Sequence, residues 1–209
     1  MNRLAALAYD RFLMGAPQEA GLRELRARAL APATGETLEI GAGTGLNLVE
    51  YPREGVTRLV CTEPSHAMAR QIGAKAGQAP AVPEVVEAPA ARLPFPDDSF
   101  DTVVGTLVFC EVPDQRAALE EIARVLKPGG SFCFLEHVRS DDPELARRQD
   151  RWAPAWRFLS GGCNCNRDTL GAIEDSDLEV AEVEHVRFPK APSIVRPVIL
   201  GRAVLGPPA

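Results

Sequence analysis

No stretch of this 209-residue sequence contains the roughly 18 consecutive apolar residues that a membrane-spanning helix requires. The apolar run near the N-terminus is short, and Asp10 and Arg11 interrupt it, so it does not fit the core of a secretory signal. We therefore expect a cytoplasmic protein without an integral membrane segment.

Lysine is also scarce, and the 23 Lys and Arg residues are outnumbered by 29 Asp and Glu residues. The formal net charge is −6, and lysine occurs only at positions 75, 127 and 190. A broad basic surface is the usual mark of a nucleic-acid-binding domain. The composition therefore argues against a nucleic-acid partner, and it leaves the oligomeric state open.

Cysteine occurs five times, an odd number that indicates reduced thiols in a cytoplasmic protein. Cys61, Cys110 and Cys133 fall in or beside apolar strand-like segments, which favours a role as small core residues. Cys163 and Cys165 have no second Cys/His pair at the spacing of a metal site. We expect no bound metal, and the role of these two cysteines stays open.

The hydrophobic fraction of 45% and the charged fraction of 25% are typical of a globular protein, and the length suits a single domain over residues 1–209. Apolar strands alternate with amphipathic helices, which predicts a parallel sheet covered on both faces. The expected strands are 36–41, 57–62, 83–87, 100–107, 130–137, 178–188 and 194–205, and the expected helices are 18–30, 45–50, 65–76, 114–126, 143–159 and one after Asp168.

The most informative segment is Leu38–Gly45, in which an apolar strand runs into Gly41-x-Gly43-x-Gly45. Glycine allows sharp turns and the close approach of a ligand. A carboxylate, Glu63, ends the next strand, where an acid can bind a ribose diol. The spacing is not the Gly-x-Gly-x-x-Gly of pyrophosphate-binding loops. It therefore favours a cofactor with a ribose but no phosphates, such as S-adenosylmethionine.

Two later segments accompany this loop: LPFPDDSFD at 93–101, and EEIARVLKPGG at 120–130 followed by a strand that ends at His137. Together the three resemble the class I S-adenosylmethionine-dependent methyltransferases over residues 36–138. The resemblance implies a Rossmann-like α/β fold with a seven-stranded, mostly parallel sheet, one antiparallel strand near 198–205, and helices on both faces. It further implies that 1–35 form a helical cap, 36–138 the cofactor-binding core, and 139–209 the substrate side.

The resemblance also implies roles for individual residues. Glu39 would accept a hydrogen bond from the amino group of the cofactor, and Glu63 would bind the ribose, unless Glu63 is only a first-turn acid of the helix that Ser65 caps. Met68 would pack over adenine or belong to the core. Alanines replace the usual adenine-binding aspartate. The expected cofactor-binding residues are Glu39, Gly41, Ala42, Gly43, Gly45, Asn47, Glu63, Pro64, Met68, Ala90, Ala91, Thr106 and Leu107.

Methyl transfer from a sulfonium needs alignment, plus a base where the acceptor must lose a proton. His137 ends the fifth core strand and is one of three histidines, so it is the first candidate for that base. The period of two along the strand leaves open whether His137 or Glu136 faces the pocket. A packing role for His137 stays open as well.

Further stretches resemble a narrower branch, which contains the mammalian alkyl-thiol methyltransferases. They are GGCNCNRDT at 161–169, the segment 195–203, and Glu136-His137-Val138. The mammalian members carry an N-terminal membrane anchor that has no counterpart in this sequence. The branch implies a small, largely apolar acceptor, with a thiol first. Methylation of a quinone, phenol or phospholipid headgroup, or a non-catalytic binding module, are the alternatives. The expected acceptor pocket contains Tyr9, Phe12, Leu13, Phe109, Cys110, Trp152, Trp156 and Phe158, although both tryptophans could instead only seat their helix on the sheet.

Overall fold

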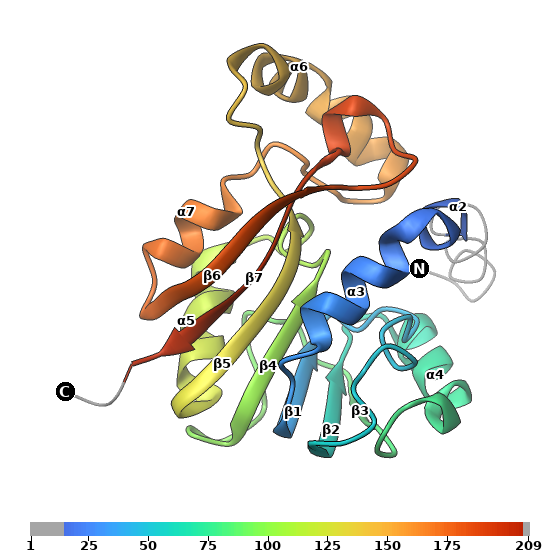
Figure 1. Cartoon of the computed structure of the whole chain (residues 1–209), viewed down its shortest axis with the longest axis vertical. Helices are drawn as coiled ribbons and strands as arrows, with labels where there is room; N and C mark the ends of the chain where they lie inside the picture. The colour runs from blue at the N-terminus through green and yellow to red at the C-terminus, as the bar shows by residue number, and fades with distance from the viewer. Residues whose placement is uncertain (1–14, 207–209) are drawn as a thin grey trace.

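In the computed structural model, which describes residues 15–206, seven strands form one sheet in the order β3-β2-β1-β4-β5-β7-β6 (Figure 1). Strands β1 to β5 are parallel, and β7 lies between β5 and β6 and runs antiparallel to both. The predicted α/β sheet with one antiparallel strand is thereby confirmed. The strands are β1 (Gly35–Ile40), β2 (Val56–Thr62), β3 (Glu84–Val86), β4 (Phe100–Thr106), β5 (Leu126–His137), β6 (Leu178–Arg187) and β7 (Pro197–Leu205).

The central strands are apolar on both faces because each face carries its own core. Leu38, Val103 and Phe132 point into one core, and the adjacent residues Val104 and Cys133 point into the other. This alternation follows from the period of two along a strand. Near-continuous apolar strands therefore require helices on both sides of the sheet.

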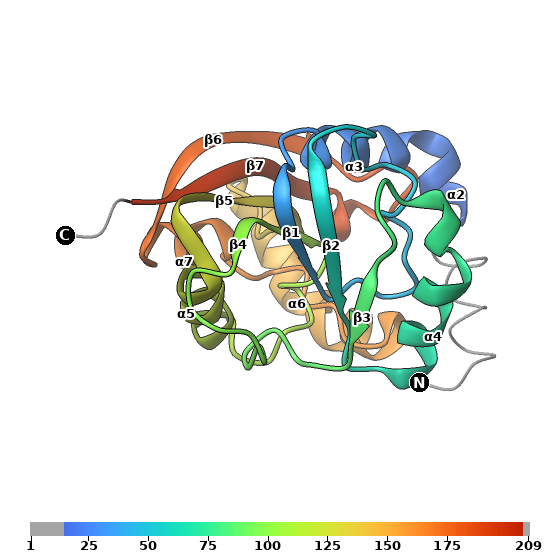
Figure 2. The same ribbon diagram turned by 90° about the horizontal axis from the view of Figure 1, so that it is seen from below.

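Helix α3 covers one face of the sheet, and α5 and α7 cover the other (Figure 2). The segment expected as one helix over 18–30 is kinked: a π-helical turn, Gln18–Leu22, precedes α3, because Gly21 has a φ of 119°. The helices are α2 (Gly15–Pro17), α3 (Arg23–Leu30), α4 (His66–Ala74), α5 (Gln115–Val125), α6 (Pro143–Ser160) and α7 (Thr169–Glu174), with short 3₁₀ turns at Ala76–Gln78 and Ser193–Val195.

The short helix expected over 45–50 is absent, and consecutive turns occupy this segment instead. Gly41, Gly43 and Gly45 all have positive φ, so the backbone that leads into residues 45–50 is not helical. Asn47 and Tyr51 also turn their side chains inward, toward the Glu39 carboxylate. In this segment, side-chain hydrogen bonds to Glu39 take the place of the helical backbone hydrogen bonds that the sequence pattern predicted.

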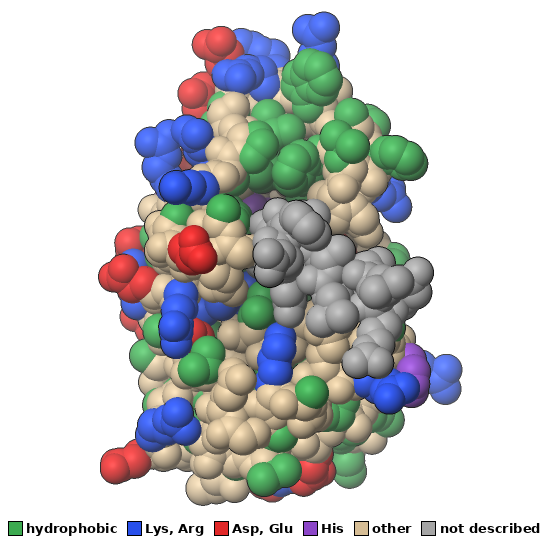
Figure 3. Space-filling view, turned by 90° about the vertical axis from the view of Figure 1, so that its right-hand side faces the viewer, with side chains coloured by type: hydrophobic (Ala, Val, Ile, Leu, Met, Phe, Trp, Pro, Cys, Tyr) green, Lys and Arg blue, Asp and Glu red, His purple; other side chains and the backbone are tan. Residues whose placement is uncertain are grey.

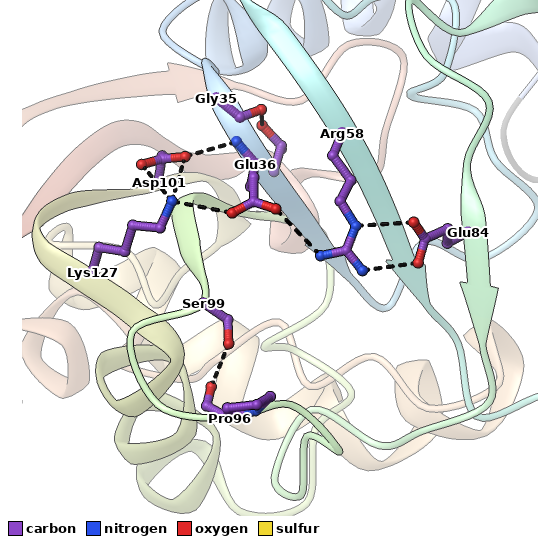
Figure 4. A network of polar contacts seen from close by, with 9 residues as sticks. Gly35, Glu36, Arg58, Glu84, Pro96, Ser99, Asp101 and Lys127 are labelled. Atoms are coloured by element: carbon purple, nitrogen blue, oxygen red, sulfur yellow. Dashed lines mark hydrogen bonds and ion pairs between the residues drawn. The ribbon is translucent and has the colours of Figure 1, made fainter.

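Ion pairs connect five strands at the edge of the sheet opposite the β4–β5 carboxyl ends (Figure 4). Arg58 of β2 donates two 2.9 Å hydrogen bonds to Glu84 of β3. Lys127 of β5 bonds Asp101 of β4 at 3.0 Å and Glu36 of β1 at 3.2 Å. Because these side chains are solvent-accessible, each pair adds about 1 kcal/mol at most. Their main effect is to favour one register.

Helix α6 stands at the top of the view in Figure 1, beyond the end of β5. The Asp142 side chain caps its first turn by accepting from the Glu144 amide, and Gly161 ends it in a left-handed conformation. The buried amide of Gln149 donates to the carbonyls of Val138, Cys165 and Ile194. One side chain thus fixes α6 against the β5 end and the C-terminal loops.

Among residues 15–206, none of the helices combines the length and the apolar character needed to cross a bilayer.

Replacing Gly201 by alanine should destabilise the fold by about 3 kcal/mol through overpacking. An added Cβ would lie 2.3 Å from the Glu182 carbonyl oxygen and 2.7 Å from Cζ of Phe134, in the middle of β7. Urea denaturation measures the change. Gly73→Ala, where the added Cβ meets open space, is the matched control and should leave stability unchanged or slightly higher. Equal stability of the two variants would contradict the close packing of β7.

Candidate cofactor and acceptor site

The strand order reverses between β1 and β4, so the loops that follow these strands diverge and leave a crevice at the carboxyl edge. A cavity of about 260 Å³ lies there. It is lined by the loops after β1, β2, β3 and β4 together with one residue each of α3 and α4, and we name it the first cavity. Its lining includes Arg26, Gly41, Ala42, Gly43, Glu63, Pro64, Met68, Ala90, Thr106, Leu107 and Glu111.

The glycine loop is held open by close packing on one side and by a carboxylate on the other. A Cβ on Gly41 would lie 2.7 Å from a methyl group of Val108, whereas a Cβ on Gly43 would meet no atom within 4 Å. The Gly43 amide donates to Oε2 of Glu63 at 3.0 Å, and the Ser65 amide donates to Oε1 at 2.9 Å. Glu63 therefore joins the loop to the start of α4. Ser65 is the N-cap residue, but its side chain makes no capping hydrogen bond.

Arg26 of α3 is the one cation that lines the first cavity within the described part of the chain. It is buried, and its Nη1 donates to Oδ1 of Asn47 at 2.7 Å and to Oγ1 of Thr106 at 2.9 Å. Arg26 was not among the residues predicted from the sequence. The available signal was its position on the apolar stripe that contains Leu22 and Leu30, where a solvated arginine would be out of place.

Behind the cavity, the Glu39 carboxylate is enclosed by polar side chains. Asn47 and Tyr51 each donate to it at 2.9 Å. Burial raises the pKa of Glu39 to about 7, although the bonds from Tyr51 and Asn47 and the charge of Arg26 oppose the shift. Glu39 is 1% exposed and does not line the cavity. Its contact with a cofactor stays a prediction.

Most of the sequence-predicted cofactor residues come together at this cavity. Nine line it: Gly41, Ala42, Gly43, Glu63, Pro64, Met68, Ala90, Thr106 and Leu107. Four do not: Glu39, Gly45, Asn47 and Ala91. Of these four, Glu39 and Asn47 belong to the buried network beneath the lining, which also contains Arg26.

A smaller cavity of about 130 Å³ adjoins the first. Leu107 and Glu111 line both cavities, so the turn that contains them separates the two spaces. Leu107 has a φ of 58°, an uncommon conformation for a branched side chain, and its amide donates to the Leu135 carbonyl. We name this space the second cavity. Its lining includes Pro17, Cys110, His137, Trp156, Ser160, Cys163, Phe188, Lys190 and Val195.

His137, and not Glu136, faces this second cavity. Its ring lies 4.9 Å from the ring of Phe188, and its Nδ1 has no hydrogen-bond partner within residues 15–206. Burial lowers the pKa of His137 to about 4, while bonds to the backbone of Val195 and Pro197 oppose the shift. The imidazole is therefore neutral near pH 7.

Glu136 lies on the other side of β5 and lines neither cavity. Its fully buried carboxylate accepts from the amides of Val108 at 2.9 Å and Phe109 at 3.1 Å. Burial raises its pKa to about 8, and these two backbone bonds oppose the shift. The arrangement gives Glu136 a visible structural task, which is to hold the turn between the two cavities.

Glu111, which the sequence analysis did not single out, projects from that turn and is the one carboxylate that borders both cavities among the described residues. Glu111 is solvent-exposed. Partial removal from water by the surrounding protein and, to a lesser degree, the negative charge of Glu63 nevertheless raise its pKa to about 7. Nothing in the local sequence indicates that Glu111 lies between the two cavities, because this position results from the tertiary placement of the 107–112 turn.

The residues expected around the acceptor divide into four groups. Cys110 and Trp156 line the second cavity, whereas Phe109 is in the core and Trp152 and Phe158 are exposed. Tyr9, Phe12 and Leu13 lie outside the described residues.

Cys110 and Cys163 both line the second cavity, and the Cys110 thiol donates to the Leu107 carbonyl at 3.6 Å. All five cysteines are buried and free of disulfides, as expected for Cys61, Cys110 and Cys133. Over residues 15–206, no group of three or more metal-ligating side chains is close enough to hold an ion.

Comparisons with known proteins agree with this geometry. The family described as "Methyltransferase domain" matches residues 38–134. Thiol S-methyltransferase TMT1A of Homo sapiens is 34% identical over 174 residues, which are 80% of this chain and 69% of that protein. Phosphatidylethanolamine N-methyltransferase of Cereibacter sphaeroides is 36% identical over 139 residues, 66% of this chain and 67% of that protein.

A solved structure, geranyl diphosphate C-methyltransferase from Streptomyces coelicolor, was determined with Mg²⁺, geranyl-S-thiolodiphosphate and S-adenosyl-L-homocysteine. It superposes with a TM-score of 0.69 at 16% identity and covers 90% of this chain and 76% of its own. At this identity the similarity establishes a shared fold.

The raised pKa of Glu39 should be visible in the pH dependence of stability. Between its ordinary value of 4.5 and about 7, the folded protein binds more protons than the unfolded chain, so stability falls as pH rises. Such a shift corresponds to about 3 kcal/mol. Glu39→Gln should remove this part of the decline, because Gln has no ionisation and the Tyr51 hydroxyl can also accept a hydrogen bond.

Denaturant titrations from pH 5 to 8 test this expectation, with the exposed Glu54→Gln as control. Buried Glu136 stays in both proteins, so some decline remains in the variant. Identical slopes for Glu39→Gln and the wild type would show that Glu39 ionises freely in the folded state.

Proposed function

Because this chain belongs to the methyltransferase-domain family and is a class I S-adenosylmethionine-dependent methyltransferase, we propose that it methylates small, largely apolar thiols. The 34% identity to a thiol S-methyltransferase over most of the chain supports this acceptor class. The single observation that carries the proposal is the pair of cavities that meet at Leu107 and Glu111. Such a pair of cavities suits a methyl donor in one space and a methyl acceptor in the other.

The first cavity fits the methyl donor. The open position at Gly43 leaves room for close approach, and the Glu63 carboxylate stands beside it as a ribose ligand. Arg26 offers a cation for the carboxylate of the bound amino acid, and Met68 and Ala90 offer apolar surface for adenine. When bound, S-adenosylmethionine supplies a methyl group on a sulfonium, which an acceptor sulfur displaces to leave S-adenosylhomocysteine.

The second cavity fits the acceptor. Apolar and sulfur-containing side chains form much of its wall, including Leu107, Cys110, Trp156, Cys163 and Phe188. Among the described residues, its ionisable nitrogen and oxygen groups are Glu111, His137 and Lys190. A mostly apolar wall with a few polar groups favours a small apolar molecule with one reactive group.

A thiol must lose its proton before its sulfur becomes a strong nucleophile, and Glu111 is suited to accept that proton. With a pKa of about 7, it lies within about 2 units of a typical thiol. His137, with a pKa of about 4, differs from a thiol by more than about 4 units. We infer that Glu111 is the base. Neutral His137 would accept a hydrogen bond at Nδ1 and orient the acceptor, and Glu136 would support the turn.

N-methylation of a phospholipid headgroup is a second candidate, which the identity to the Cereibacter sphaeroides enzyme favours. An amine acceptor also needs a base, so the same site chemistry would serve it.

A cytoplasmic location is part of our proposal, and the odd number of cysteines supports it.

S-adenosylmethionine and S-adenosylhomocysteine should raise the melting temperature as their concentration rises, whereas NAD and FAD should not. In calorimetry, Glu63→Ala should weaken S-adenosylhomocysteine binding by about 1–3 kcal/mol, the scale of a hydrogen bond to a charged group. The exposed Glu54→Ala is the control. Unchanged affinity in Glu63→Ala, together with lower stability, would leave Glu63 only a structural role. A response to NAD alone would contradict the cofactor assignment.

Glu111→Gln should lower kcat/KM by about 10²-fold for alkyl thiols, since it removes the base. Aromatic thiols that are ionised at the assay pH should be much less affected. His137→Ala should raise the KM for the acceptor and leave the dependence on acceptor pKa unchanged. Neither variant should alter S-adenosylhomocysteine affinity by more than a few-fold.

A panel of thiols and phenols of graded pKa, assayed by S-adenosylhomocysteine release, measures these effects, with Glu54→Gln as control. If the loss depends on acceptor pKa in His137→Ala and not in Glu111→Gln, then His137 is the base. If the wild type binds the cofactor but turns over no member of the panel, the acceptor class is wrong.

A further inference from the structure

Helix α6 carries large apolar side chains on the face that points away from the protein. Phe158 is 86% exposed, Leu159 72% and Trp152 54%. The opposite face of the helix is buried through Ala146, Gln149 and Ala153. Figure 3 shows hydrophobic side chains gathered over the upper part of the molecule, where Figure 1 places α6.

The spacing makes this face continuous. Trp152, Ala155 and Leu159 are related by three and four residues, so they lie on one side of the helix, and Phe158 lies next to them. Exposed apolar side chains scattered singly are ordinary, but a group on one helix face marks an interaction site. We name these four residues the outer face of α6.

Arginines accompany the outer face. Arg147, Arg148 and Arg151 are exposed and precede it by one to two turns on the same side of the helix. Helix α6 has four arginines, at 147, 148, 151 and 157, against two acids, Glu144 and Asp150, so it is locally positive in a chain whose net charge is −6. A helix with apolar side chains and arginines on its exposed side suits the boundary between anionic lipid headgroups and acyl chains.

We propose that the outer face of α6 binds the surface of membranes that contain anionic phospholipids. Phe158, Leu159 and the Trp152 indole would enter the headgroup region, and the arginines would bind lipid phosphates. This is attachment to a surface by one helix and does not require a membrane-spanning segment.

Two observations favour a lipid surface over a second copy of the chain. The arginines beside the outer face complement anionic headgroups, whereas a second copy of this face would carry the same excess of positive charge and offer no complementary one. The inner side of the same helix also contributes Trp156 and Ser160 to the second cavity. Docking by α6 would therefore bring that cavity close to the lipid phase, in which apolar acceptors concentrate.

Sedimentation with vesicles tests this inference on the full chain. The protein should pellet with vesicles of phosphatidylcholine mixed with phosphatidylglycerol, and at least 10-fold less with phosphatidylcholine alone. The double variant Phe158→Ser with Leu159→Ser should reduce binding by 10-fold or more. Arg147→Gln with Arg151→Gln should reduce both the binding and its sensitivity to salt. Val82→Ser, at a position that is 82% exposed and outside α6, should bind like the wild type.

Tryptophan fluorescence gives a second measurement. Vesicles should shift the emission to shorter wavelength in the wild type and not in Trp152→Phe, which retains Trp156. Three results would overturn the inference. They are no binding to anionic vesicles, self-association that the Phe158 and Leu159 changes abolish, or binding that the α6 changes leave intact but that Leu4→Ser with Leu7→Ser abolishes, since these two leucines belong to the short apolar run near the N-terminus. Cofactor binding is measured separately, so failure here leaves the proposed methyl transfer intact.

Discussion

The shape of both cavities depends on buried carboxylates that hold loop backbone in place. Glu63, after β2, fixes the glycine loop and the start of α4 through two amide hydrogen bonds. Glu136, near the end of β5, fixes the turn after β4 in the same way. Each bond to an ionised carboxylate contributes about 1.5–3 kcal/mol, and an unpaired carboxylate at either position would cost more than that. A neutral apolar side chain could fill the same space, but it would leave the loop amides unsatisfied.

This arrangement has an energetic consequence, because carboxylates removed from water resist ionisation. Burial raises the pKa of Glu39 to about 7 and that of Glu136 to about 8. Near neutral pH the folded protein thus retains protons on carboxyl groups that are ionised in the unfolded chain, so it loses part of its stability as the pH rises. Ionisable groups with strongly shifted pKa values cluster at functional sites, where the residue is retained for its function and not for stability. Glu111 differs from both, because it points into the space that a reacting molecule would occupy.

The sequence predicted the sheet, the glycine loop and Glu63 because these depend on local patterns: apolar strands, glycine spacing and the position of an acid after a strand. It could not decide between Glu136 and His137, because a strand that is buried on both faces gives no polar side from which to read orientation. Arg26 was missed because arginine on a helix is usually solvated. Glu111 was missed because its importance comes from a turn whose backbone is held by a residue 25 positions later. The 45–50 turns replace a helix for the same reason, since Glu39 draws in Asn47 and Tyr51.

The two cavities draw on different parts of the chain, and this division bears on specificity. The first is lined by residues between 26 and 113, while the second takes His137, Trp156, Cys163, Phe188 and Val195 from beyond β4. If the second cavity holds the acceptor, as we propose, substitutions in α6 or the C-terminal loops can change the acceptor without disturbing the glycine loop. Relatives with one fold can accordingly act on thiols or on phospholipid headgroups, as the names of the two curated relatives indicate. Gln149 couples the two parts, because its hydrogen bonds to Val138, Cys165 and Ile194 hold α6 over the end of β5. A helix fixed by its buried face can vary its exposed face freely, so acceptor choice and the surface on which the enzyme works can evolve on one element.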